Sequence, residues 1–264
     1  MELVSSLQNP KIKNLVKLQK ASERNAQNVF IVEGLKEINL AINANYIPQS
    51  VFWCPEMGLR EKELLHLFNL CKNVYSISKD AFEKIAYREG SDGLIVVFEQ
   101  QKQSLQSIKL SSNPLIIILE AVEKPGNLGA ILRTADAANV DLVIICDPRT
   151  DLFNPNVIRS SIGCLFTNQI VACSNNEALV WLKKNKIKSY AAALVKGSKP
   201  YHTFNFKTRT ALIMGTEADG LSDFWLANAD EKIIIPMQGK IDSLNVSVST
   251  AIIVFEVIRQ RDFK

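Results

Sequence analysis

The chain has 264 residues, of which 47% are hydrophobic and 22% charged, and its formal net charge is +4. This composition is typical of a soluble globular protein, excludes a disordered chain, and supplies enough apolar residues for one large or two ordinary domains. The first residues lack the apolar core of a signal peptide, and no apolar run is long enough to span a membrane. We therefore expect a cytoplasmic protein without membrane contacts.

Cysteine and histidine content argues against metal and redox sites. The five cysteines are scattered without any CxxC spacing, which predicts reduced and mostly buried thiols. The two histidines, His66 and His202, lie far apart in the sequence and have no partners at metal-ligand spacing. We therefore predict neither a bound metal nor a histidine-based catalytic triad.

A basic helix over residues 11–24 is the first predicted element. At about 100° per residue, four basic side chains share one face of this helix, and apolar side chains occupy the other. The basic face is either an ordinary solvated surface or a surface that follows the phosphate backbone of a nucleic acid. Its residues are Lys13, Lys17, Lys20 and Arg24.

The rest of the first hundred residues alternates strand-like and helix-like stretches, which predicts a small α/β domain over residues 1–99. Residues 100–113 are rich in glutamine and serine and poor in apolar side chains, which predicts a linker. The predicted strands of the first domain are 29–34, 50–54, 74–78 and 93–99, and the predicted helices that follow the basic one are 35–45 and 61–71.

A second domain is predicted over residues 114–264. Its apolar runs are nearly continuous and are mostly separated by helical stretches, which indicates a parallel sheet covered on both faces. A long helix over residues 245–261 closes the chain. The predicted strands are 115–120, 141–146, 169–173, 189–195, 210–215 and 232–236.

Three loops follow strands of this second domain, where α/β proteins tend to bind ligands. They are residues 123–134, 215–222 and 235–249. The first contains only Gly126 and Gly129, so it lacks the GxGxxG spacing of a dinucleotide site, and no P-loop lysine follows. A nucleotide-dependent oxidoreductase would need that fingerprint and is therefore disfavoured.

Taken together, the three loops resemble the motifs of a known family. The stretches NLGAILRTADA, GTEADGLS and IPMQGKIDSLNVSVSTA resemble, in order and spacing, the three motifs of the SpoU (TrmH) family of RNA ribose 2′-O-methyltransferases, within the SPOUT class. The N-terminal stretches NPKIKNLVKL and FIVEGLKEINLAI resemble the small substrate-binding domain of that family, which is similar to ribosomal protein L30e. The resemblance covers nearly the whole chain.

This resemblance implies an α/β fold with a small N-terminal L30e-like domain and a C-terminal SPOUT domain. The family's SPOUT domain has a parallel sheet and a deep trefoil knot, and its knotted loops bind S-adenosylmethionine. The resemblance also implies a homodimer and an RNA substrate, for which the L30e-like domain makes ribosomal RNA the first expectation and transfer RNA the second. A non-catalytic RNA-binding protein on the same scaffold is the alternative, and the intact motif residues argue against it.

The resemblance assigns Arg133 and Asn127 to the first motif. Arg133 matches the arginine that the family is credited with using to activate the ribose 2′-hydroxyl. Because a guanidinium almost never loses its proton, holding a neighbouring phosphate and stabilising developing alkoxide charge suits this residue better. A surface ion pair is the structural alternative. Asn127 matches the asparagine of the motif and is expected to shape the loop or contact RNA.

The second and third motifs supply the remaining site residues that the resemblance implies. Glu217 is the acid of the second motif, which orients the loop or offsets the sulfonium charge, unless it only begins a helix. Ser243 and Asn245 match polar residues near the reaction centre, although helix capping is an alternative that suits Ser243 better than Asn245. The implied cofactor-binding residues are Met214, Gly215, Thr216, Gly220, Ile235, Met237 and Leu244.

One further stretch, residues 154–163, resembles the family segment beside the RNA-facing cleft. Its Arg159 is a candidate phosphate contact, and an ordinary surface arginine is the alternative.

Overall fold

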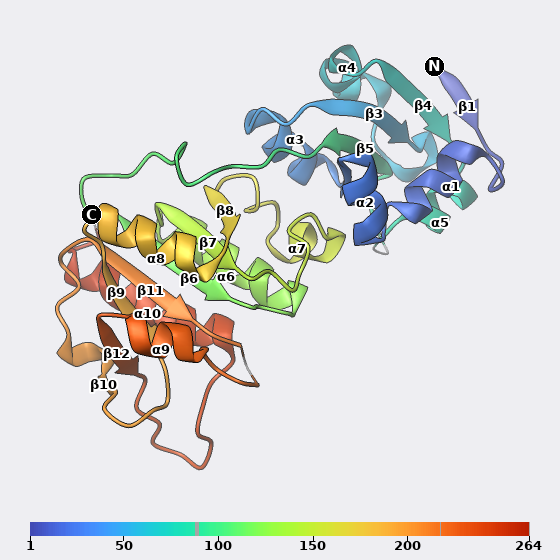
Figure 1. The fold of residues 1–264 in the computed structure, drawn as a ribbon. Helices are drawn as coiled ribbons and strands as arrows, with labels where there is room; N and C mark the ends of the chain where they lie inside the picture. The colour runs from blue at the N-terminus through green and yellow to red at the C-terminus, as the bar shows by residue number, and fades with distance from the viewer. Residues whose placement is uncertain (88–89, 217, 264) are drawn as a thin grey trace. The chain divides into compact units, whose positions relative to one another are not determined.

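The computed structural model describes residues 1–87, 90–216 and 218–263 (Figure 1). Internal contacts divide the chain into two compact units. The first unit contains Met1–Gln101 and Asp151–Phe166, and the second contains Lys102–Thr150 and Thr167–Lys264. The chain therefore crosses between the units after Gln101, after Thr150 and again after Phe166.

The first unit is built on a five-stranded mixed sheet with the strand order β1-β4-β3-β5-β2. Strand β5 runs antiparallel to β2 and β3, whereas β4 runs parallel to β1 and β3. The four strands predicted here are confirmed, and the three-residue β1 is an addition that no apolar pattern indicates. The strands are β1 (Glu2–Val4), β2 (Val29–Glu33), β3 (Pro48–Trp53), β4 (Asn73–Ile77) and β5 (Leu94–Glu99), and the helices are α1 (Pro10–Lys17), α2 (Ala21–Gln27), α3 (Leu35–Asn43), α4 (Glu61–Leu70), α5 (Lys79–Ile85) and α7 (Pro155–Ser160).

The segment Asp151–Phe166 comes from the later half of the sequence but packs inside the first unit. Its Phe153 stacks on Phe30 of β2 with a distance of 4.3 Å between the ring centroids. Gly163 adopts a φ of +83°, and a Cβ atom there would lie 2.6 Å from a methyl carbon of Leu40. This close approach explains the glycine, and the aromatic stacking makes the segment part of the core of the unit.

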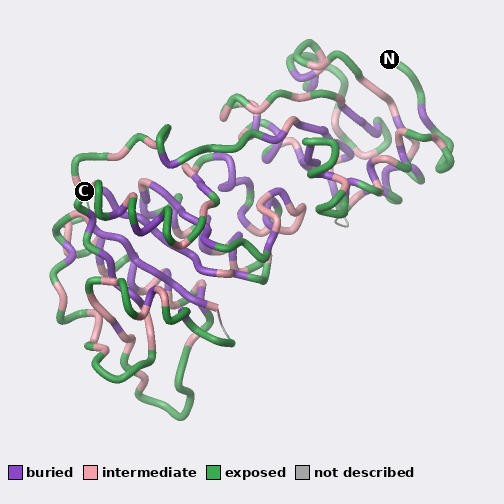
Figure 2. Tube along the Cα trace, in the orientation of Figure 1, coloured by how far each residue is buried: buried purple, intermediate pink, exposed green. Residues whose placement is uncertain are grey.

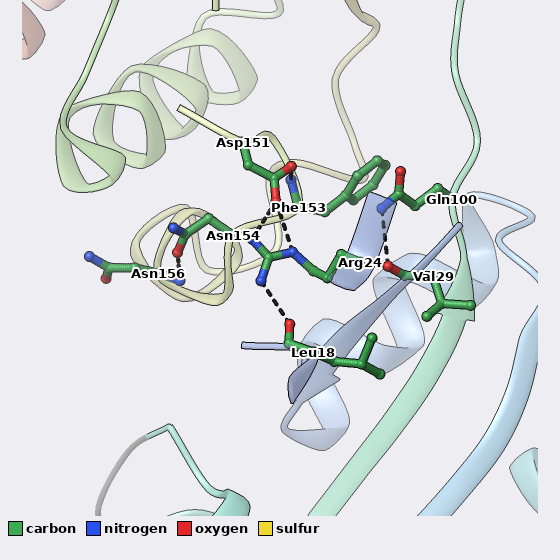
Figure 3. Close-up of polar contacts among 8 residues, drawn as sticks. All are labelled: Leu18, Arg24, Val29, Gln100, Asp151, Phe153, Asn154 and Asn156. Carbon is green, nitrogen blue, oxygen red and sulfur yellow. Dashed lines mark hydrogen bonds and ion pairs between the residues drawn. The ribbon is translucent and has the colours of Figure 1, made fainter. Parts of the chain in front are cut away.

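The structure corrects the prediction of one basic helix over residues 11–24. Helix α1 ends at Lys17, and a separate helix α2 begins after Lys20. Arg24 is only 1% exposed, because its guanidinium donates hydrogen bonds to the Leu18 carbonyl at 2.7 Å and to the Asp151 carboxylate, with Nε at 2.8 Å from Oδ2 (Figure 3). Arg24 therefore cannot belong to an exposed basic face, and the prediction for this residue is wrong.

The second unit is built on a seven-stranded sheet with the order β10-β12-β9-β11-β6-β7-β8. Every strand pair in its described residues is parallel, which confirms the predicted parallel sheet. The central strands β6, β7 and β11 are buried along their whole length (Figure 2). The strands are β6 (Leu115–Glu120), β7 (Leu142–Cys146), β8 (Ile170–Cys173), β9 (Lys188–Ala192), β10 (Lys199–Pro200), β11 (Thr210–Met214) and β12 (Glu231–Ile234), and the helices are α6 (Pro125–Ala137), α8 (Asn175–Lys184), α9 (Asp223–Asn228) and α10 (Val246–Gln260).

Residues 102–113 contain no helix or strand, yet they pack on the second unit. Leu105 is buried in its core, and the Leu105 carbonyl accepts a hydrogen bond from Nε1 of Trp181 in α8 at 3.1 Å. The contacts therefore group this stretch with the second unit, whereas its composition suggests a linker.

No helix in residues 1–87, 90–216 and 218–263 is long and apolar enough to cross a membrane. Within the same ranges, no group of three or more histidine, cysteine, aspartate or glutamate side chains could hold a metal ion.

Candidate cofactor cavity and its surroundings

A cavity of about 390 Å³ lies at the carboxyl ends of β9, β11 and β12, beside the start of α10. Its volume is typical of a small-molecule site. All seven residues that the family resemblance implies for cofactor binding line this cavity, and Ser243 lines it as well. The seven are Met214, Gly215, Thr216, Gly220, Ile235, Met237 and Leu244.

The loop after β11 needs glycine at two of these positions. A Cβ atom on Gly215 would lie 2.2 Å from the carbonyl carbon of Gly220, so no larger residue fits. Thr216 and Gly220 exchange two backbone hydrogen bonds of 2.9 and 3.2 Å, and Gly220 adopts a φ of +70°. Both glycines are therefore required by the backbone of the loop itself. Glu217, the predicted acid of this loop, lies outside the described residues.

The loop after β9 forms a wall of the cavity that the sequence does not predict. Its lining residues are Ala192, Ala193, Leu194 and Val195. The apolar pattern extends the strand through residue 195, but β9 ends at Ala192. In the sheet order, β9 lies between β11 and β12, so its carboxyl end must open beside their loops. This order is a property of the fold that the local pattern of residues does not indicate.

The cavity lining carries no cation among the described residues. Its charged side chains are Asp219 and Asp242, and most of its other residues are apolar. Arginine and lysine are the side chains that bind phosphate groups most strongly, and the described lining has carboxylates in their place. The lining therefore suits a ligand that is uncharged or positively charged better than NAD or ATP.

Residues of the first and third motifs meet beside this cavity. The side-chain amide of Asn245 donates a hydrogen bond to Oδ1 of Asn127 at 3.1 Å, although 118 positions separate them in the sequence. Asn127 also lines a smaller hollow of about 80 Å³, which shares Gly215 and Thr216 with the cavity. The packing of α6 against α10 produces this meeting point.

The structure reverses the expectation for helix capping in the third motif. Asn245 is the N-cap of α10, and its Oδ1 accepts from the backbone N–H of Ser247 at 2.9 Å. Ser243 caps no helix, and its hydroxyl donates to Asp242 at 3.0 Å. Asn245 thus combines a cap with a contact to Asn127, because an asparagine amide accepts through its oxygen and donates through its nitrogen.

Arg133 lies on the exposed side of α6, away from the cavity lining. No ion pair in the described part of the chain includes this guanidinium. The structural alternative, a surface salt bridge, therefore finds no support.

The remaining predicted RNA-binding residues lie in the first unit. Lys13, Lys17 and Lys20 are all exposed, although they come from α1 and the turn that follows it. Arg159 is exposed on α7 and lines a small hollow together with Glu33 and Glu37. Carboxylates in the same hollow would oppose a phosphate there, and RNA binding by Arg159 and by the three lysines stays a prediction.

Two family models match the chain. The SpoU rRNA Methylase family matches residues 114–255, and the MRM3-like substrate binding domain matches residues 9–96. Among curated proteins, the 23S rRNA (guanosine(2553)-2′-O)-methyltransferase RlmP of Bacillus subtilis is 30% identical over 97% of this chain and 99% of its own.

Solved structures resemble the whole chain. An AdoMet-bound rRNA methyltransferase from Sinorhizobium meliloti is 28% identical, with a TM-score of 0.89 over 98% of this chain and 97% of its own. The SpoU methyltransferase AviRb from Streptomyces viridochromogenes, in complex with AdoMet, is 25% identical, with a TM-score of 0.86 over 97% of this chain and 100% of its own. With the motifs, the cavity and these matches in agreement, the chain belongs to the SpoU rRNA methylase family.

Proposed function

We propose that this protein transfers a methyl group from S-adenosylmethionine to a ribose 2′-hydroxyl of ribosomal RNA. The observation that carries this proposal is a cavity built from the second and third motifs, with no cation among its described lining residues, beside the contact between Asn127 and Asn245. Relatives that align with nearly the whole chain are named as rRNA methyltransferases, which supports ribosomal RNA over transfer RNA.

The residues present fit S-adenosylmethionine. Ile235, Met237 and Leu244 offer apolar walls to an adenine ring, and the tight turn at Gly215 exposes backbone groups to the ligand. Asp219 and Asp242 lie in the lining, where negative charge favours a positively charged ligand. When bound, the cofactor would supply an activated methyl group on its sulfonium sulfur.

Outside the cavity, the chain's own residues would orient the RNA. Arg133 would hold a phosphate beside the target ribose and stabilise the negative charge that develops on the hydroxyl oxygen. The contact between Asn127 and Asn245 fixes the two amides at the edge of the cavity, where the ribose has to approach. Alignment of the hydroxyl with the methyl group is the main contribution that such positioning makes.

We also propose a homodimer in the cytoplasm, with the trefoil knot that the resemblance implies. One side of α10 repeats apolar residues at helical spacing, with Val248 46% and Phe255 43% exposed and Ile252 half-buried between them. A second copy of the chain would bury this side of α10. Because α6 packs against α10, Arg133 would then lie near the partner.

Ligand-induced stabilisation tests the cofactor. S-adenosylhomocysteine should raise the melting temperature, because a ligand that binds only the folded state stabilises it by about 2.7 kcal/mol at 100 times its Kd. NAD and ATP should leave it unchanged, since the lining offers their phosphates no cation. A shift with NAD and none with S-adenosylhomocysteine would refute the proposal.

Methyl transfer tests the reaction. Labelled S-adenosylmethionine is incubated with unmodified ribosomal RNA or transfer RNA, and the labelled nucleotide is mapped as a ribose 2′-O-methyl group. We expect label in ribosomal RNA. Cofactor binding without transfer to either RNA would favour the non-catalytic alternative.

A further inference from the structure

A buried carboxylate at the end of β6, which none of the three motifs includes, accepts three hydrogen bonds. Glu120 is only 4% exposed. Its Oε1 accepts from the Ser222 hydroxyl at 2.6 Å and from Nδ2 of Asn175 at 2.7 Å, and its Oε2 accepts from the Ser222 backbone N–H at 2.8 Å. Burying a carboxylate costs free energy unless its oxygens accept hydrogen bonds. These three donors therefore suit a side chain that accepts hydrogen bonds and donates none.

The direction of this network is fixed by Trp225. The indole Nε1, which can only donate, is bonded to Oδ1 of Asn175 at 2.6 Å, and Trp225 is fully buried. The Asn175 amide therefore cannot rotate by 180°, and its Nδ2 must point at Glu120 and at Asp147, 2.8 Å away. The network ties the ends of β6 and β7 to the first residues of α8 and α9.

This network holds the end of the loop that lines the cofactor cavity. In the register of β11 with β6, Met214 pairs with Leu119, which places Glu120 beside the start of the loop. Ser222 follows the lining residues Gly220 and Leu221 directly. Although Ser222 is the N-cap of α9, its hydroxyl makes no capping hydrogen bond and donates to Glu120 instead.

We infer that Glu120 is a positioning residue for cofactor binding, which acts by fixing Ser222 and thereby the conformation of the lining residues 218–221 that precede it. This inference rests on the proposed function, because the loop is taken to bind S-adenosylmethionine. Glu120 lines neither the cavity nor the adjoining hollow, so it acts through Ser222 and not through contact with the ligand.

A charge-preserving swap tests the inference. Glu120→Gln keeps the shape of the side chain but replaces one acceptor oxygen by an NH2 group. In either orientation this NH2 group faces another donor, the Asn175 amide nitrogen or the Ser222 backbone N–H. Asn175 cannot rotate to remove this clash between donors. Asn175→Asp alone sets a second carboxylate against Glu120. In the double variant, the amide introduced at position 120 would donate to the new carboxylate at position 175, which still accepts from Trp225, while the exposed Asp147 turns towards solvent.

Three measurements are made on wild type, both single variants and the double variant: the Kd for S-adenosylhomocysteine, the KM for RNA transcribed in vitro, and amide hydrogen exchange at residues 218–222. Each single variant should raise the Kd about 10-fold, the effect of one opposed buried pair, and speed exchange at Ser222 by a similar factor. The KM for RNA should change less than about 2-fold, and the double variant should recover most of the loss.

Glu231→Gln is the matched control. It makes the same chemical change in the same unit, at a half-buried carboxylate that pairs with Lys188 at 3.0 Å, and it should leave the Kd and the exchange unchanged. Any one of three results would overturn the inference. Glu120→Gln keeps the wild-type Kd and exchange rate, or the affinities for cofactor and RNA fall equally, or the double variant binds the cofactor no better than the single variants. If wild type itself fails to bind S-adenosylhomocysteine, the proposed function fails, while exchange at Ser222 still decides whether Glu120 fixes the loop.

Discussion

Asn245 serves two purposes through the two ends of one side-chain amide. Its oxygen caps α10, and its nitrogen donates to Asn127 beside the cavity. Aspartate is an equally good N-cap and favours the positive end of the helix, but it has no proton to donate to Asn127. Substitution by aspartate therefore separates the structural purpose from the functional one.

We predict that Asn245→Asp leaves the melting temperature within about 2 °C of wild type and lowers the rate of methyl transfer by about 10²–10³-fold, the usual effect of removing one positioned donor. Thermal unfolding and single-turnover methyl transfer measure the two quantities. Asn245→Ala is the comparison, since it loses the cap as well and should cost about 1 kcal/mol of stability. Full activity in Asn245→Asp would show that the contact with Asn127 is only structural.

Near the end of α10, Glu256 gives the protein a pH-dependent contribution to stability. Its carboxylate accepts from Arg259 at 2.7 and 2.8 Å and from Gln260 at 2.7 Å, and the hydrogen bonds from Arg259 are the main cause of a lowered pKa for Glu256. Gln260 in turn holds the backbone of Phe204 and Phe206. Because the folded pKa is lowered, this stabilisation is present above the unfolded pKa and is lost as the pH falls through the folded value.

Glu256→Gln should therefore lower the free energy of unfolding by about 0.5–1 kcal/mol at neutral pH, a modest figure because Arg259 is largely exposed to solvent. Urea unfolding at neutral pH and at the lowest pH where the chain still folds measures the difference. The two proteins should converge at acid pH. A difference that persists there would mean that shape, and not charge, accounts for the loss.

At the scale of elements, the break between α1 and α2 changes which charges can contact RNA. Three lysines remain exposed there after Arg24 is withdrawn into its ion pair with Asp151. Replacing Lys13, Lys17 and Lys20 together by alanine should weaken RNA binding and reduce the slope of log K against log salt by about 2–3, since each phosphate contact contributes about 0.7–0.9.

Filter binding at several salt concentrations gives that slope, and S-adenosylhomocysteine binding should stay unchanged. The matched control replaces three other exposed lysines of the same unit, Lys36, Lys62 and Lys72, which carry the same total charge at scattered positions. If both triple variants weakened RNA binding equally, the positions of Lys13, Lys17 and Lys20 would not matter, and only the net charge of the unit would contribute to RNA affinity.

Elements with a strong local pattern were predictable from the sequence, and those set by distant contacts were not. The buried strands β6, β7 and β11 and the closing helix α10 follow directly from apolar runs. No glycine or proline marks the break before α2, whose Arg24 is fixed by Asp151, 127 residues away. The cavity shows the same division. Its motif loops carry recognisable residues, whereas the wall after β9 depends on the order of strands in the sheet.

At the scale of the whole molecule, the exposed Arg133 raises the question of which cavity it serves. We propose that it completes the site of the partner chain in a homodimer. Arg133→Ala and Asn245→Asp should then each nearly abolish methyl transfer, yet a mixed dimer would contain one site with both lesions and one with neither. Random reassortment makes about half of the dimers mixed, so about a quarter of wild-type activity should return when the two inactive variants are refolded together.

The control is each variant refolded alone, with mixed dimers verified by two different affinity tags. If every site is built within one chain, all sites in the mixture carry one lesion, and no activity returns. That result would place Arg133 at its own cavity.

The three crossings of the chain between its units also constrain the order in which the protein can fold during synthesis. The first unit cannot cover Phe30 or pair Arg24 until Asp151–Phe166 has been made. From Gln101 to Phe166 the ribosome adds 65 residues, 166 minus 101, which takes about 3–13 s at about 5–20 residues per second. In that interval β6, α6 and β7 have already been made. An incomplete first unit, with Phe30 still uncovered, must therefore persist on the ribosome while these three elements of the second unit are made.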